Sequence, residues 1–234
     1  MILSHKYKFI FFANPKTATT AIEKALKNID ETNTIAEKLI AIEQKYPFLK
    51  TQNLIHIRPQ YLQEAIDPEI WHSYYKFVFV RNPWDWVLSQ YNQNFCKIGS
   101  NKYKLGLVLH NLFLQPHPNI DMRRERYFLK RDFDLHWNFQ KRRRGIKEEK
   151  NSFQYQFVRD SNGNKLVDYI GRYENLKADL ERVFNKVGLE HIKLPVANKS
   201  HGKSLSYRDY YREDTKALVA DKYREDIALF GYEF

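Results

Sequence analysis

The chain has 234 residues, a net charge of +11 and an isoelectric point of about 9.5, so its partner is expected to be anionic. Hydrophobic residues make up 43%, as in globular proteins, and no run of about 18 apolar residues is present to form a membrane-spanning helix. Its single cysteine, Cys96, cannot form an internal disulfide, and the first residues lack the apolar region of a signal peptide. We therefore expect a cytoplasmic protein and, from its length, a single domain spanning residues 1–234.

The first distinctive stretch is a short apolar run followed by a polar turn. Phe9–Ala13 has no polar residue, which is typical of a strand buried on both faces of a parallel sheet. Apolar residues recur at helical spacing from Ala21, so a helix is predicted to begin near Thr19 or Thr20.

The turn between this strand and helix carries one lysine and three threonines but no glycine, which excludes a Walker A loop. A strand, a tight loop and a helix N-terminus present backbone N–H groups and a positive dipole end to an anion. The turn therefore predicts a phosphate or sulfate cradle. The alternative is an ordinary connection in which a threonine caps the helix.

The next segments are predicted from apolar spacing and proline positions. Apolar residues between Ile35 and Ile42 predict a helix that ends before Pro47. Leu54–Ile57 is expected to be extended, and a helix is expected from Pro59 through Ile66.

Tyr74–Val80 is the clearest strand pattern, and it is followed by Arg81, by Asn82 as a helix cap and by Pro83 as the first helical residue. The chain thus repeats the order of buried strand, polar turn and helix. Ser89 lies about two helical turns further on and is a candidate for the same anion. The alternatives are a surface ion pair for Arg81 and a plain helix-face serine for Ser89.

Parallel strands of an open α/β sheet bind ligands beyond their carboxyl ends, where the two turns should meet. A nucleotide phosphorylated at its 5′ and 3′ positions would place one charged group on each turn.

The second half of the chain begins with a basic segment. Residues 97–150 are predicted to be an insertion with helical pieces at about Tyr103–Leu114 and Arg131–Arg143. Between Arg123 and Lys150 there are eleven Lys and Arg against five Asp and Glu. This segment is interpreted either as a groove for an anionic glycan or as a solvated helical face. Aromatic residues that would stack on sugar rings in such a groove are Tyr127, Trp137 and Phe139.

The remaining elements are a hairpin and two helices. Gln154–Arg159 and Leu166–Ile170 are predicted to pair around a turn at Ser161–Asn164. Leu176–Val187 is amphipathic and should end at Gly188, and a last helix is expected over about Glu213–Phe230.

These residues carry a resemblance to the PAPS-dependent sulfotransferases, which use 3′-phosphoadenosine 5′-phosphosulfate. Pro15–Thr20 resembles their 5′-phosphosulfate loop, and Phe77–Pro83 with Ser89 resembles their 3′-phosphate motif. Val167–Leu176 and Asp226–Tyr232 are similar to segments of the carbohydrate-type branch, sulfotransferase family 2. The likeness covers residues 8–95 and 153–234, and it departs at Ala18, where many members have glycine.

The resemblance implies a three-layer, P-loop-like α/β fold with a mainly parallel central sheet. It implies transfer of a sulfuryl group from PAPS to an acceptor hydroxyl or amine, on a carbohydrate, with PAP as product and without a metal. Residues expected to bind the nucleotide are Lys16, Thr17, Ala18, Thr19, Thr20, Arg81, Ser89, Lys199, Ser200 and Lys203.

Two residues are assigned catalytic roles by this resemblance. Lys16 would stabilise charge on the oxygen that bridges phosphate and sulfate. His56 would remove the acceptor proton, because its ordinary pKa suits a base at neutral pH. Its alternative is a histidine satisfied within the sheet. Glu174 is the second candidate base, and His136 and His201 are weaker ones.

Other functions compete with this interpretation. A P-loop nucleotide kinase shares the strand, loop and helix but needs the glycine-lysine loop that is missing here. A nucleic-acid-binding protein would explain the charge but not the two turns, so no nucleic-acid partner is expected. A relative that only binds the nucleotide is the third alternative. The sequence predicts no oligomeric state.

Overall fold

A computed structural model describes residues 1–47, 49, 54–95, 153–193, 206–211 and 213–234. The chain divides into two compact units, Met1–Arg81 with Phe153–Lys199, and Asn82–Ser152 with Ser200–Phe234. Cys96 and the predicted insertion at 97–150 lie outside the described residues. The single domain therefore stays a prediction. Within the described residues, no helix combines the length and the apolar character that a bilayer crossing requires.

The first unit is built on a four-stranded sheet in the order β1-β2-β3-β4. The strands β2, β3 and β4 run parallel, and β1 pairs with β2 in the antiparallel direction. The bounds of the strands are Ile2–Ser4 for β1, Phe9–Phe12 for β2, Tyr75–Val80 for β3 and Tyr169–Arg172 for β4. The predicted strands at Phe9 and Tyr74 are thus confirmed.

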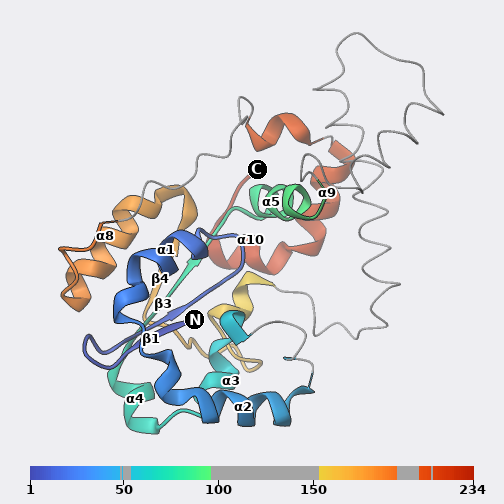
Figure 1. Cartoon of the computed structure of the whole chain (residues 1–234). Helices are drawn as coiled ribbons and strands as arrows, with labels where there is room; N and C mark the ends of the chain where they lie inside the picture. Colours follow the sequence, from blue (N-terminus) through green and yellow to red (C-terminus); the bar gives the residue numbers. More distant parts are fainter. Residues whose placement is uncertain (48, 50–53, 96–152, 194–205, 212) are drawn as a thin grey trace. The chain divides into compact units, whose positions relative to one another are not determined.

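Helices and 3₁₀ turns of the first unit connect these strands (Figure 1). The α-helices are α1 at Thr19–Leu26, α2 at Ala36–Lys45, α3 at Pro59–Gln63, α4 at Pro68–Ser73 and α8 at Leu176–Val187. The 3₁₀ turns are η1 at Lys27–Ile29, η2 at Thr32–Ile35, η4 at Leu54–His56, η6 at Gln154–Phe157 and η7 at Tyr173–Asn175.

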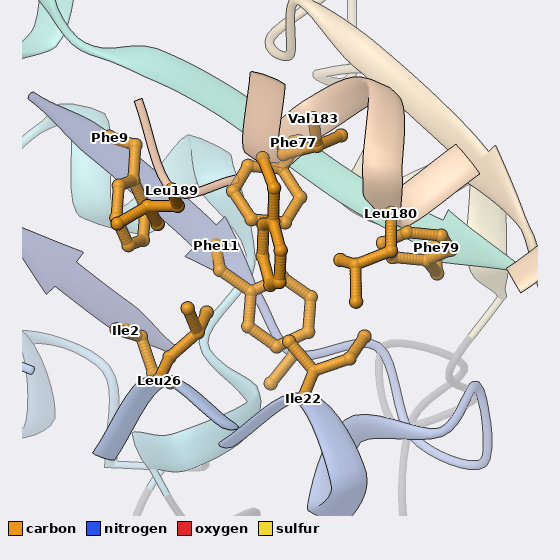
Figure 2. Close-up of a cluster of buried hydrophobic side chains, with 12 residues drawn as sticks. Ile2, Phe9, Phe11, Ile22, Leu26, Phe77, Phe79, Leu180, Val183 and Leu189 are labelled. Carbon is orange, nitrogen blue, oxygen red and sulfur yellow. The ribbon is translucent and has the colours of Figure 1, made fainter. Parts of the chain in front are cut away.

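Alternate residues of the strands face a core that α1 and α8 cover. Phe9 and Phe11 of β2 and Phe77 and Phe79 of β3 lie on this face (Figure 2). The rings of Phe11 and Phe77 stack with centroids 5.2 Å apart. Helices contribute Ile22 and Leu26 from α1 and Leu180 and Val183 from α8. Burial of these large apolar side chains is the main force that holds the sheet and the two helices together.

The other face of the sheet is also apolar. Ile10, Phe12, Val78 and Val80 are buried there, and the Phe12 ring meets Trp71 of α4 edge-on at 6.4 Å. An α/β unit with a mostly parallel sheet and flanking helices therefore matches the predicted class. The finer three-layer, P-loop-like description stays a prediction.

Three predictions for this unit were wrong. Leu54–His56 is a 3₁₀ turn rather than an extended segment. The helix from Pro59 ends at Gln63, and Asp67 then caps the separate helix α4 through the N–H of Glu69. The hairpin shrinks to a single bridge between Arg159 and Lys165, because Gln154–Phe157 is a 3₁₀ turn and β4 pairs with β3 instead.

The second unit contains helices, α5 at Pro83–Phe95, α9 at Glu213–Lys222 and α10 at Arg224–Phe230, with the turn η8 at Tyr207–Tyr210. The Asn82 side chain accepts from the Trp84 N–H at 3.1 Å, as expected for the cap of α5. The predicted last helix is two helices, because the chain leaves α-helical geometry at Tyr223.

Candidate nucleotide-binding site

The turn after β2 adopts an unusual backbone conformation. Lys16 and Ala18 both have positive φ, 68° and 64°, whereas Thr17 between them does not. Alternation of right- and left-handed residues points successive N–H groups toward one side and makes a concave anion site. Ala18 is the N-cap of α1, and no side chain caps this helix within the described part of the chain. The dipole end of α1 thus faces this concavity.

Asn14 organises the turn from within. Its carbonyl oxygen accepts from the hydroxyls of Thr17 and Thr19, each at 2.7 Å, and Thr17 is fully buried. Two hydroxyl protons are thus used to shape the loop. The side chain of Thr20, by contrast, is exposed. Of the three threonines, Thr20 has the hydroxyl most accessible to a ligand.

Arg81 connects the second turn to the first. Its side chain is buried, with 4% of the residue exposed, which argues against a surface ion pair. The Nη1 atom donates to the carbonyl oxygen of Lys16 at 3.0 Å. The guanidinium also stacks over the ring of Tyr173, 4.0 Å from its centroid. These contacts hold the guanidinium plane beside the lysine turn, at the carboxyl ends of β2 and β3.

A buried amide network supports both turns. Asn14 Nδ2 donates to the carbonyl oxygen of Phe79 at 2.9 Å and to Gln154 Oε1 at 3.1 Å. Gln154 Oε1 also accepts from the Arg81 N–H at 2.8 Å, and Gln154 Nε2 donates to the Arg81 carbonyl at 2.7 Å. The local pattern predicts a hairpin strand at Gln154 and no site role for Asn14. No local pattern could have revealed that these residues meet, since they are 140 positions apart.

His56 lies beside the same turn. Its Nδ1 atom donates to the carbonyl oxygen of Ala13 at 2.7 Å, because a carbonyl can only accept. In the neutral ring the lone pair is therefore on Nε2. Burial lowers the pKa of His56 from its usual value of 6.5, and the bond to Ala13 opposes this shift. A neutral imidazole with a defined tautomer beside an anion cradle has the properties of a general base.

Comparison with known proteins identifies the family. The Sulfotransfer_2 model, described as "Sulfotransferase family", matches residues 1–233. The chain belongs to the sulfotransferase family. Neither a search of curated proteins nor a search of solved structures found a match.

Of the remaining predicted site residues, two lie within the described part of the chain and the others lie outside it. Ser89 is half-buried on α5 in the second unit, and Glu174 is exposed on η7 in the first unit. Those outside the described residues are Tyr127, His136, Trp137, Phe139, Lys199, Ser200, His201 and Lys203. Among the residues that are described, no group of three His, Cys, Asp or Glu side chains could hold a metal ion.

The first unit also contains a cavity that lies away from the two turns. This cavity of about 480 Å³ is lined by Trp71, Lys76, Lys165 and Asp168, among others. Lys76 is buried and donates to the carbonyls of Trp71 and Tyr74 at 2.9 and 2.7 Å, and it pairs with Asp168 at 3.1 Å. Internal bonds thus account for the buried lysine, at the amino end of β3.

Proposed function

We propose that this sulfotransferase transfers a sulfuryl group from PAPS to a hydroxyl or amine of a carbohydrate acceptor. The proposal rests chiefly on one observation, the 3.0 Å bond between Arg81 Nη1 and the Lys16 carbonyl. This bond brings two cationic turns together at the ends of adjacent parallel strands, where α/β proteins bind their ligands. A nucleotide with anionic groups at both its 5′ and 3′ positions suits such a pair of turns.

The residues of the first turn fit the 5′ end of PAPS. The positive φ values of Lys16 and Ala18 and the start of α1, which no side chain of the described residues caps, provide backbone N–H groups and a positive dipole end for an anion. We assign the 5′ side to Lys16, Thr17, Ala18, Thr19 and Thr20. The Thr20 side chain adds an exposed hydroxyl, whereas Thr17 and Thr19 contribute through their N–H groups.

The second turn fits the 3′-phosphate. Arg81 presents a guanidinium whose orientation is restricted by the Lys16 carbonyl and the Tyr173 ring. A planar fork of N–H donors that is already oriented binds a phosphate at a lower entropic cost than a mobile side chain.

In the reaction PAPS supplies an activated sulfuryl group, and the protein supplies position, charge and a base. The S–O bond to the 5′-phosphate breaks while an S–O bond to the acceptor oxygen forms. Lys16 stabilises the negative charge that develops on the phosphate oxygen. His56 Nε2 accepts the proton that the acceptor hydroxyl releases.

The proposal is tested by thermal shift with adenosine 3′,5′-bisphosphate (PAP), with ATP and Mg²⁺, and with single-stranded RNA. At 100 times its Kd a ligand adds about 2.7 kcal/mol to the stability of the native state. For a chain of this size that corresponds to a rise in Tm of roughly 5–10 °C. Of the three ligands, we expect only PAP to produce this rise in Tm. We expect the Lys16→Ala and Arg81→Ala variants to lose most of the rise.

Each variant is compared with its own unliganded Tm, because Arg81 is buried and its loss also changes stability. Lys24→Ala and Arg159→Ala remove exposed cations elsewhere in the unit and serve as matched controls. A shift produced only by ATP with Mg²⁺ would indicate a kinase, and one produced only by RNA would indicate a nucleic-acid-binding protein. Release of PAP from PAPS in the presence of a carbohydrate acceptor then measures transfer directly.

A further inference from the structure

Gln154 occupies a central place between the two turns. The residue is 0% exposed, at the start of η6, and its one amide group bonds to residues of both turns. Its Oε1 atom accepts from the N–H of Arg81 and from Asn14 Nδ2, and its Nε2 atom donates to the carbonyl of Arg81. The side chain therefore pairs with both backbone polar groups of Arg81, as a neighbouring strand would.

Arg81 lies just beyond the end of the registered pairing between β3 and β4. The last registered pair between β3 and β4 joins Val80 to Arg172, one residue earlier. Buried backbone N–H and C=O groups without a partner cost free energy comparable to a lost hydrogen bond. The amide of Gln154 continues the hydrogen-bonding pattern of the strand for one residue and so defines where the Arg81 backbone lies.

The same amide also reaches the first turn. Asn14 bonds to Gln154 at 3.1 Å, and through its own carbonyl it holds the hydroxyls of Thr17 and Thr19. A continuous chain of hydrogen bonds thus runs from the lysine turn through Asn14 and Gln154 to Arg81. Each bond in it is buried, where water does not compete.

We infer that Gln154 is a positioning residue that sets the spacing of the two anion-binding turns. This inference rests on the proposed function. Loss of the amide removes one acceptor and one donor from the backbone of Arg81 and one acceptor from Asn14. The consequence falls mainly on a ligand that spans both turns and less on a ligand that occupies only one.

The test compares PAP with 5′-AMP, which lacks the 3′-phosphate, by calorimetric titration of the full chain. The readout is the ratio of the two Kd values, AMP over PAP. We expect Gln154→Leu to lower this ratio by about tenfold, which corresponds to the net contribution of about one buried hydrogen bond to the binding of the spanning ligand. Gln156→Leu is the matched control, since Gln156 lies in the same 3₁₀ turn and its Oε1 atom has no partner in the described residues. We expect this control to change the ratio less than twofold.

The outcomes separate the inference from the proposed function. If the wild-type chain binds PAP no more tightly than AMP, the two-turn nucleotide site itself is wrong. If the wild type prefers PAP and the folded Gln154→Leu variant has the same ratio of Kd values as the wild type, Gln154 has no positioning role. The same conclusion follows if the variant binds PAP and AMP more weakly by the same factor, because the ratio is then also unchanged. Should Gln154→Leu not fold, Gln154→Asn decides in the same way. It keeps an uncharged amide but shortens its reach to Arg81 and Asn14 by one methylene, and we again expect the ratio to fall, whereas an unchanged ratio would contradict the positioning role.

Discussion

At the scale of single residues, Ala18 holds a conformation that residues other than glycine rarely adopt. Its φ of 64° is in the left-handed region, where a Cβ atom costs about 1–2 kcal/mol. Many of the sulfotransferases that the sequence resembles have glycine at this position, and the positive φ explains that preference. The turn is held in this conformation by the hydrogen bonds from the Thr17 and Thr19 hydroxyls to the Asn14 carbonyl.

Ala18→Gly is therefore expected to raise the free energy of unfolding by about 0.5 kcal/mol, because relief of strain slightly exceeds the added chain entropy of glycine. Ala25→Gly is the control within the same helix, α1, where glycine should lower stability by about 1 kcal/mol. Urea denaturation of both variants measures the difference. Equal losses at the two positions would contradict the conformation assigned to Ala18.

His56 determines the expected pH dependence. Since burial lowers its pKa below 6.5, the neutral form dominates at pH 7, and this is the form that the proposed role as base requires. The rate of transfer should stay constant down to about pH 6.5 and should then fall as the pH passes through the lowered pKa of His56. Because the pKa is lowered, the His56 ring is harder to protonate in the native state than in the unfolded state. The native state therefore loses stability as the pH falls below 6.5, and this loss is absent above pH 6.5.

The pH–rate profile of the wild type should thus have an acidic limb with its midpoint below 6.5. His56→Ala should reduce kcat by roughly 10²–10⁴-fold and remove that limb. His72→Ala, which removes an exposed histidine from α4, should leave the profile unchanged. Full activity in His56→Ala would assign the base to another residue, with Glu174 the next candidate.

At the scale of elements, the pairing of β3 with β4 depends on a close approach. Phe79 and Gly171 are registered partners across these strands. A Cβ atom on Gly171 would lie 2.3 Å from the ring carbon Cε1 of Phe79, which is fully buried. Glycine is required here for space rather than for backbone conformation.

Gly171→Ala should consequently lower the free energy of unfolding by about 1–3 kcal/mol through overpacking. Phe79→Leu makes room at this contact, so the double variant should lose less than the sum of the two single losses. A double-mutant cycle by chemical denaturation measures this coupling. Strictly additive losses would show that the ring moves away without cost.

At the scale of the whole molecule, the net charge of +11 creates a field that attracts anions. The basic segment from Arg123 to Lys150 contributes to this charge and lies outside the described residues. Its predicted role as a glycan groove stays a prediction. The net charge nevertheless predicts that the association with anions depends on salt concentration.

The association rate constant for PAP should fall by about tenfold between 50 and 500 mM salt, because the Debye length shortens from roughly 14 to 4 Å. Stopped-flow measurements with adenosine as a neutral control test this expectation. An equal salt response of adenosine and PAP would show that attraction by the net charge plays no part.

Several elements followed from local sequence alone. The apolar runs at Phe9 and Tyr74 predicted β2 and β3, and the spacing from Leu176 to Val187 with Gly188 predicted α8 and its end. These patterns work because strand and helix periods are set by neighbours a few positions apart. The two turns also followed, since a parallel sheet places the ends of its strands at one edge.

Only the tertiary structure revealed the contacts that join the turns. The Arg81 side chain meets Lys16, 65 positions away, and Gln154 meets Asn14 across 140 positions. The pairing of β1 with β2 and of β4 with β3 likewise depends on which strand edges the fold leaves available. The sequence by itself determined β2, β3, α8 and the residue types in the turns after the two strands, because these depend on near neighbours. Which distant amide would hold the two ends together was decided by packing, because only the folded core brings such residues within bonding distance.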